Sequence, residues 1–312
     1  KLHQENSVMK PKLSNRFIAI CLGLFVAFLW STSWVLIKFG LEDIPAISFA
    51  GLRYGVATLC LLPFLVKKEN FECIRNLNKK DWSGLILLGV LWYAVSQGAQ
   101  FLGLKVLPAM TVSLLLNMTP LIVSMLGVVL LHEKPTKLQW IGMAINLTGV
   151  GLYFFPSAFE NAQIAGIVAV LIGVFSNAFS SILGRGINRT KKIPVMVVTT
   201  ISMGIGSILL LITGAIFQGI PAISLKSWGI ILWLAILNTA IAFNLWNFSL
   251  RTITAMESSL INSTMLIQIA LLAFFILGEK LSPQQWIGMA FAAFGVVLVQ
   301  LRLNGEKGHA DR

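Results

Sequence analysis

Ten stretches of about 20 apolar residues occupy most of this 312-residue chain, and they constrain its fold more than any other feature. A stretch of this length suits a membrane-crossing α-helix, because a helix rises about 1.5 Å per residue and the hydrocarbon core is about 30 Å thick. Hydrophobic residues make up 56% of the chain and charged residues only 12%. A soluble protein of this size could not bury that much apolar surface, so the sequence predicts an all-α polytopic membrane protein.

The ten predicted transmembrane helices form two groups of five. The first group runs over Phe17–Ile37, Pro45–Val66, Trp82–Leu102, Ala109–Leu131 and Leu138–Phe155. The second group runs over Ile164–Leu183, Pro194–Phe217, Trp228–Phe248, Ala255–Leu277 and Gln284–Leu301. We therefore expect a cytoplasmic N-terminal segment (1–16), two helical units (17–155 and 164–301) and a cytoplasmic tail (302–312).

An internal repeat relates the two groups. The pattern Glu-Lys, four residues, then Gln-Trp-Ile-Gly-Met-Ala occupies residues 133–144 and recurs at 279–290, an offset of 146. The same offset pairs Ala109-Met110 with Ala255-Met256. The chain is therefore two copies of a five-helix unit. Because five is odd, the second copy is predicted to be inverted in the membrane, as in many secondary transporters, whose substrate site lies where the repeats meet.

Smaller features of the repeat predict local structure. Thr136 with Gln139, and Ser282 with Gln285, have the spacing of capping boxes that begin the fifth and tenth helices. Each of these helices also carries two glycines two turns apart, which predicts close helix packing rather than a ligand role. These glycines are Gly142, Gly149, Gly288 and Gly295.

The distribution of cations predicts the orientation. Most Lys and Arg residues lie in the two terminal segments and the loops on their side, which places both termini in the cytoplasm of a multi-pass inner-membrane protein. The loops on the opposite side carry only Lys38, Lys105, Lys226 and Lys280. We interpret the net charge of +12 as cationic loops that face an anionic leaflet, and not as a nucleic-acid-binding surface.

Several motifs resemble the EamA family of the drug/metabolite transporter superfamily, which includes bacterial amino-acid and metabolite exporters. They are Phe28-Leu29-Trp30-Ser31, Arg53-Tyr54, Leu104–Ala109, and the Glu-Lys and Gln-Trp-Ile-Gly pattern of each repeat. The resemblance implies ten helices, two EamA repeats, and export or exchange of small metabolites. It also implies that Arg53 is a family feature of the second helix rather than a substrate clamp.

One departure from the family concerns proline. The family often has a proline midway along the fourth and ninth helices, and this chain has Pro120 in the fourth. The repeat places Leu266 at the equivalent position of the ninth helix, so a kink-based gate is not expected there.

Polar and aromatic residues near the helix centres are the candidate substrate-binding residues, because a polar group at membrane depth is costly unless it is paired or faces a cavity. The candidates are Trp30, Ser33, Tyr93, Gln97, Asn117, Ser176, Asn177, Asn238, Trp246 and Asn262. The alternative for each polar side chain is an interhelical hydrogen bond, worth about 0.6 kcal/mol on average. For each tryptophan the alternative is a lipid-facing position.

Charged residues within the spans are few. Glu257 is the candidate for proton coupling, but Thr254 and Glu257 also have capping-box spacing at the start of the ninth helix, and we favour the cap. Glu133 and Glu279 follow helices and are expected to pair with the adjacent Lys134 and Lys280. The scarcity of cations favours neutral, zwitterionic or weakly charged substrates over phosphorylated ones.

The function predicted from these features is that of a secondary transporter that exports or exchanges small metabolites, amino acids foremost, by alternating access. No catalytic constellation, metal-ligand pattern or cofactor motif accompanies the spans, so we expect no enzyme activity, metal or cofactor. The alternatives are a passive channel or lipid scramblase and, among transporters, one for drugs, nucleosides or cofactors. The expected partners are the lipid bilayer, a small-molecule substrate and, if Glu257 titrates, protons.

Overall fold

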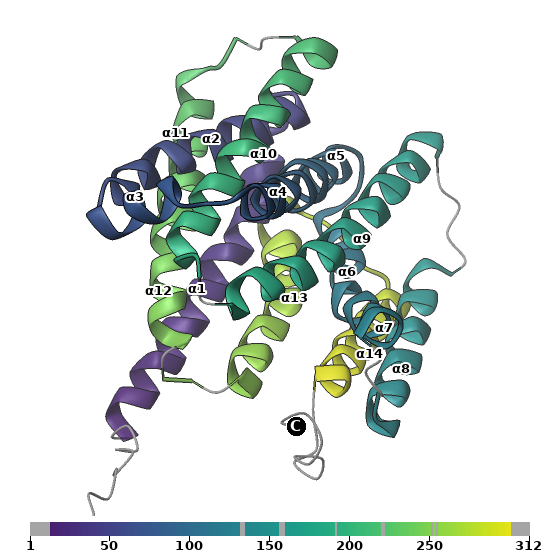
Figure 1. Cartoon of the computed structure of the whole chain (residues 1–312). Coiled ribbons are helices and arrows are strands. Elements are labelled where there is room, and N and C mark those ends of the chain that lie inside the picture. The colour runs from purple at the N-terminus through teal and green to yellow at the C-terminus, as the bar shows by residue number, and fades with distance from the viewer. Residues whose placement is uncertain are drawn as a thin grey trace, which may run out of the picture.

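The computed structural model describes residues 13–131, 135–155, 160–190, 192–219, 222–250, 252–253 and 255–300. Every secondary-structure element in these ranges is a helix (Figure 1). The first half contains α1 (Leu13–Gly40), α2 (Ala46–Leu65), α3 (Lys68–Arg75), α4 (Lys79–Leu88), η1 (Gly89–Gln97), α5 (Gly98–Val106), α6 (Ala109–Leu116), α7 (Thr119–Leu131) and α8 (Lys137–Phe154). The second contains α9 (Asn161–Arg189), α10 (Val195–Gln218), α11 (Leu225–Ala235), η2 (Ile236–Ile241), α12 (Ala242–Leu250), α13 (Ala255–Leu277) and α14 (Pro283–Gln300). The predicted cytoplasmic tail lies outside the described residues, as does most of the N-terminal segment.

Seven helical segments of the described chain are long and apolar enough to cross a membrane. They are α1, α2, the continuous α4–η1–α5, α6–α7, α9, α10 and α13. The apolar segment Leu225–Ile241 is shorter, and α8 and α14 have 18 residues each with polar first turns. The prediction of an all-helical polytopic membrane protein is therefore confirmed. Of the ten predicted spans, seven are long and apolar enough in the described residues to cross a membrane.

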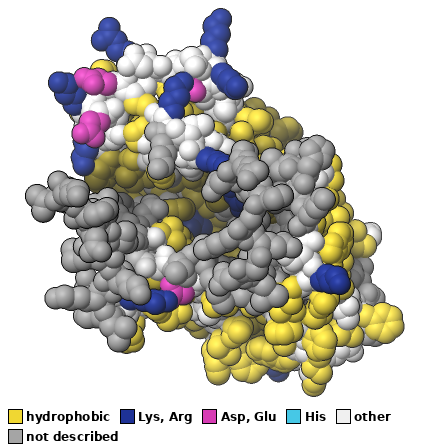
Figure 2. All heavy atoms as spheres, turned by 60° about the horizontal axis from the view of Figure 1, so that its bottom comes forward, with side chains coloured by type: hydrophobic (Ala, Val, Ile, Leu, Met, Phe, Trp, Pro, Cys, Tyr) yellow, Lys and Arg dark blue, Asp and Glu magenta, His cyan; other side chains and the backbone are white. Residues whose placement is uncertain are grey.

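The surface of the described residues is rich in large apolar side chains. Phe217, Val66 and Phe275 are each more than three-quarters exposed, which is a costly arrangement in water. Figure 2 shows broad areas of hydrophobic side chains on one face, with Lys and Arg gathered mainly at one edge. Such a distribution is expected where lipid surrounds the apolar band.

Contacts between the two halves come in equivalent pairs. The first helix of the first half, α1, packs against η2 and α12, and the first helix of the second half, α9, packs against η1 and α5. In the same way α1 contacts α13, while α9 contacts α7. The second helices, α2 and α10, pack together, and so do the last helices, α8 and α14, which lie side by side in Figure 1. This arrangement fits two repeats related by a pseudo-two-fold axis.

The predicted glycine packing is confirmed between α8 and α14. A Cβ added to Gly142 would stand 2.7 Å from the carbonyl oxygen of Gly295, and one added to Gly149 would stand 2.5 Å from that of Gly288. Real Cβ atoms do not approach so closely, so only glycine permits this helix separation. The side chain of Asn146 adds a hydrogen bond of 2.7 Å to the carbonyl of Ala292.

Both predicted capping boxes are also confirmed. Thr136 and Gln139 exchange hydrogen bonds between side chain and backbone at the start of α8. Ser282 and Gln285 do the same before α14. Each box satisfies two of the backbone N–H groups that a helix start leaves without partners.

Candidate functional site

Two π-helical segments lie at equivalent positions of the repeats. The offset of 146 carries η1 (Gly89–Gln97) onto residues 235–243, which include η2 (Ile236–Ile241). A π-helix is uncommon and is frequently found at functional sites. Tyr93 and Gln97 lie in η1, whereas Asn238 lies in η2, so three of the predicted site residues occupy these two segments.

One group of predicted residues meets where α1 contacts η2. The indole Nε1 of Trp30 donates a hydrogen bond of 3.1 Å to the backbone carbonyl of Asn238, and the Asn238 amide donates one of 2.8 Å to Ser33 Oγ. The Trp30 ring also lies 5.4 Å from the ring of Trp246 on α12. The structure therefore brings Trp30, Ser33, Asn238 and Trp246 together, with the indole N–H engaged by protein.

The contacts of Asn238 fix the orientation of its side-chain amide. Its Nδ2 donates to the carbonyl of Leu29 and to the hydroxyls of Thr32 (3.2 Å) and Ser33. A carbonyl can only accept, so the amide nitrogen must face Leu29. The opposite atom, Oδ1, is buried without a hydrogen-bond partner in the described structure, which is costly for a polar atom.

A second group forms between α2 and η1. The hydroxyl of Tyr54 on α2 donates a hydrogen bond of 2.6 Å to Oε1 of Gln97, and the rings of Tyr54 and Tyr93 lie 5.4 Å apart in an edge-to-face arrangement. Tyr54 is not among the site residues predicted from the sequence. The one feature of the sequence that pointed to it is its place after Arg53 in the family-like Arg-Tyr motif.

Arg53 lies next to Tyr54 on α2 and is buried. The residue is 6% exposed, and its Nε has no hydrogen-bond partner among the described residues. Within the described residues the guanidinium makes no ion pair, and its Cζ lies 5.1 Å from the ring centroid of the adjacent Tyr54. A charged group in this setting is rare in membrane proteins.

Ser176 repeats the role of Trp30 in the other half. It lies 146 residues after Trp30, and its hydroxyl donates a hydrogen bond of 2.7 Å to the carbonyl of Leu91 in η1. The first helix of each repeat thus donates a side-chain hydrogen bond into the π-helix of the other repeat.

Three other predicted residues do not join these groups. Asn117 is the C-cap of α6, where the fourth predicted span breaks before Pro120. The backbone carbonyl of Asn177 accepts hydrogen bonds from Ser180 and Ser181. Asn262 is exposed on α13. As expected from the lack of a second proline, α13 runs unbroken through Leu266.

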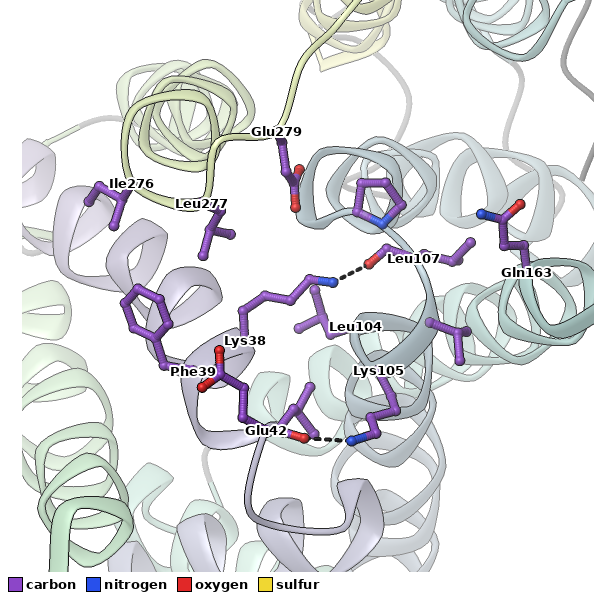
Figure 3. Close-up of a pocket in the computed structure, with 13 residues that line it drawn as sticks. Lys38, Phe39, Glu42, Leu104, Lys105, Leu107, Gln163, Ile276, Leu277 and Glu279 are labelled. Atoms are coloured by element: carbon purple, nitrogen blue, oxygen red, sulfur yellow. Dashed lines mark hydrogen bonds between the residues drawn. The ribbon is translucent and has the colours of Figure 1, made fainter. Parts of the chain in front are cut away.

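A pocket of about 640 Å³ lies where the ends of α1, α5 and α13 meet (Figure 3). Two lysines connect the first two of these helix ends reciprocally. Lys38 Nζ donates 2.6 Å to the carbonyl of Leu107, beyond the end of α5, and Lys105 Nζ donates 2.6 Å to the carbonyl of Leu41, beyond the end of α1. Each ammonium group therefore satisfies a carbonyl at the negative end of the other helix.

Glu279 completes this pocket and corrects one expectation. Its carboxylate accepts hydrogen bonds from the backbone N–H groups of Ala109 (2.6 Å) and Met110 (3.1 Å), so it caps α6 of the other repeat instead of pairing with Lys280. Gly278 makes this possible, because its φ of 66° turns the chain sharply after α13. The equivalent pair Glu133 and Lys134 lies outside the described residues.

Glu257 contacts the start of α1. Its Oε1 accepts from Arg16 Nη2 at 2.6 Å and from Arg16 Nε at 3.0 Å, which joins the first turns of α13 and α1. The sequence did not indicate this partner, since the two residues lie 241 positions apart. Thr254, the other half of the predicted capping box, lies outside the described residues.

Comparisons with known proteins agree with this architecture. A protein from Escherichia coli K12 described as "Uncharacterized inner membrane transporter YedA" is 28% identical over 291 residues, which cover 89% of this chain and 90% of that protein. The "Uncharacterized transporter YoaV" of Bacillus subtilis is 24% identical over 251 residues, covering 78% and 83%. One crystal structure shares the fold with a TM-score of 0.64 at 17% identity, covering 90% of this chain and 96% of the other. Residues 17–155 and 164–301 each match the EamA-like transporter family, and the chain therefore belongs to that family.

Proposed function

We propose that this protein is a secondary transporter that exports or exchanges small neutral or zwitterionic metabolites, amino acids foremost, by alternating access. The observation that carries the proposal is the exchanged pair of hydrogen bonds, from Trp30 to the Asn238 carbonyl and from Ser176 to the Leu91 carbonyl. These bonds link the repeats at two equivalent π-helices that carry polar side chains. Contacts of the same kind in both repeats allow two conformations of similar energy, with one of the two hydrogen bonds weakened in each conformation.

The proposed location is the inner membrane, with both termini in the cytoplasm. The basic loops on one side support this orientation. The apolar helices and the description of YedA as an inner-membrane transporter support the membrane. Protons are proposed only as a coupling ion to be tested, because the Glu257 carboxylate is held by Arg16 in this structure.

Counterflow in proteoliposomes tests the proposal. Vesicles that contain the purified protein are loaded with one unlabelled amino acid, and uptake of the same labelled amino acid is followed over time. A transporter is expected to show transient accumulation of label above equilibrium, driven by the gradient of unlabelled substrate across the vesicle membrane. Equal uptake with and without internal substrate would indicate a channel, and transfer of labelled lipid between leaflets would indicate a scramblase. Counterflow with nucleosides but with no amino acid would identify the protein as a nucleoside transporter and contradict the proposed amino-acid substrate.

A further inference from the structure

Arg53 is a buried cation whose Nε has no hydrogen-bond partner in the described helices. The family resemblance implies that Arg53 is a family feature of the second helix and not a substrate clamp, but its buried Nε without a partner favours a different role. We propose that Arg53 binds the carboxylate of the transported solute and that Oδ1 of Asn238 accepts a hydrogen bond from its ammonium group. The substrate class is then an α-amino acid or a similar small zwitterion. This inference rests on the proposed transport function and assigns the residues that recognise the two charges.

A buried guanidinium such as that of Arg53 needs hydrogen-bond acceptors and a counter-ion. The side chain stays protonated in proteins and presents five N–H donors. Its Nε is buried without a hydrogen-bond partner in the described structure. The ring of Tyr54 supplies a cation–π contact but no hydrogen bond. A guanidinium held in this way is stabilised by any ligand that brings an acceptor and a negative charge.

The described part of the protein offers no carboxylate at this depth. Arg53 lies about two turns inside α2. The described Asp and Glu residues lie near helix ends, in the short α3, or in connecting segments: Glu42, Asp43, Glu69, Glu72, Asp81, Glu160, Glu257 and Glu279. The counter-ion must therefore come from outside this set, and a carboxylate matches the planar fork of a guanidinium through two parallel hydrogen bonds.

Asn238 supplies the complementary group. Its Nδ2 is held by Leu29, Thr32 and Ser33, which leaves Oδ1 as a buried acceptor without a donor. η2, which carries Asn238, packs against α2, which carries Arg53. The adjoining helices thus present one unpaired donor group and one unpaired acceptor, the two functions that a zwitterion requires.

A single carboxylate fits this site better than a phosphate group does. Arg53 is the only cation in the central part of the described long helices, while Lys38 and Lys105 lie near helix ends and already donate to carbonyls. A phosphate carries more negative charge and is normally held by several cations. The aromatic rings of Tyr54 and Tyr93 beside the site suit an apolar side chain of the solute.

Ligand analogues that lack one charge test the assignment. The proteinogenic L-α-amino acids are screened for thermal stabilisation of the purified full-length protein. Each amino acid that binds is compared with its carboxamide, which lacks the carboxylate, and with its N-acetyl derivative, which lacks the ammonium group. We expect each analogue to bind at least about tenfold more weakly than the parent, the scale of one lost charge-assisted hydrogen bond.

Variants then locate the two contacts. In Arg53→Gln the amino acid is expected to bind no better than its carboxamide, and the ligand-free protein is expected to melt no lower than the wild type, because an unpaired buried charge has been removed. Arg53→Lys should recover part of the preference for the carboxylate. Asn238→Ala should remove the preference over the N-acetyl derivative. Lys226→Gln, on the exposed start of α11, is the matched control and should keep both preferences.

Three results would overturn the proposal. They are an undiminished carboxylate preference in Arg53→Gln, loss of that preference in Lys38→Gln instead, and binding of carboxamides but of no amino acid by the wild type. Counterflow on the same preparations separates the two levels of inference. Carboxylate-dependent binding without counterflow would support the Arg53 site but contradict the transport function. Counterflow of uncharged solutes alone would support the transport function but contradict the site.

Discussion

Trp30 and Asn238, 208 positions apart in the sequence, join the two halves of the protein through one hydrogen bond from the indole N–H to a backbone carbonyl. The carbonyl belongs to a π-helix, and the indole ring packs against Trp246 of the following helix. A large aromatic side chain therefore fixes the first helix of one repeat against the third helix of the other. Ser176, at the position equivalent to Trp30, donates to a carbonyl of the other π-helix in turn, so each repeat makes a linkage of this kind.

Replacing Trp30 by Phe separates the hydrogen bond from the aromatic packing. We expect the variant to lose about 1 kcal/mol of stability, the net value of one hydrogen bond, and to show slower counterflow. Trp233→Phe is the matched control, since Trp233 is 51% exposed on α11. Melting temperature and counterflow of the purified variants provide the measurement. An unchanged melting temperature and rate in Trp30→Phe would show that the bond has no role.

Gly149→Ala tests the contact between α8 and α14. The added methyl group would meet backbone atoms of Ala292 and Gly288, so we expect a destabilisation of about 1–3 kcal/mol or loss of folded protein. Gly151→Ala in the same helix is the control, because nothing lies within 4 Å of the added Cβ. Thermal unfolding of both variants in detergent gives the comparison. Equal stability of the two would mean that the helices separate easily.

Glu279→Gln tests the cap that one repeat places on the other. The amide retains one acceptor for the N–H groups of Ala109 and Met110 but loses the charge that favours a helix N-terminus. We expect a loss of about 0.5–2 kcal/mol. Glu42→Gln, which changes a carboxylate lining the same pocket, should cost less in the same thermal assay. The reverse order would contradict the capping role.

Glu257→Gln distinguishes a structural carboxylate from a coupling carboxylate. If the residue only joins α13 to α1, both Glu257→Gln and Arg16→Gln should lose about 0–1 kcal/mol, the value of an exposed ion pair, and both should keep proton-driven uptake. We expect this result. Loss of pH-driven uptake in Glu257→Gln alone, with counterflow and melting temperature preserved, would identify Glu257 as the coupling residue.

Labelling of Cys73 tests the orientation. This thiol lies in α3, within a basic connection that we place on the cytoplasmic side, whereas Cys21 and Cys60 lie in α1 and α2. A variant in which those two cysteines are replaced by Ala should react with a membrane-impermeant maleimide only after the cells are opened. Reaction in intact cells would reverse the predicted topology.

Local patterns were enough to predict the membrane class, the two repeats, the capping boxes at Thr136 and Ser282, and the glycine contact of α8 with α14. These features depend on residues a few positions apart or on a fixed offset. A helix start requires a nearby side-chain acceptor, and close helix packing requires small residues on one face. The sequence of each segment therefore carries the information that determines them.

The tertiary structure decided which polar groups meet and which are left without partners. Whether Trp30 faces lipid, a solute or the Asn238 carbonyl depends on the rotation of α1 against a helix more than 200 residues away. Glu279 could pair with its neighbour, but Gly278 turns the carboxylate toward α6. Arg53 belongs to a family-like motif, yet the lack of a partner for its Nε follows from the burial of α2 among helices whose described residues bring no carboxylate to it. Hydrogen bonds and ion pairs act over a few ångströms, so only the packing of distant segments determines whether they form.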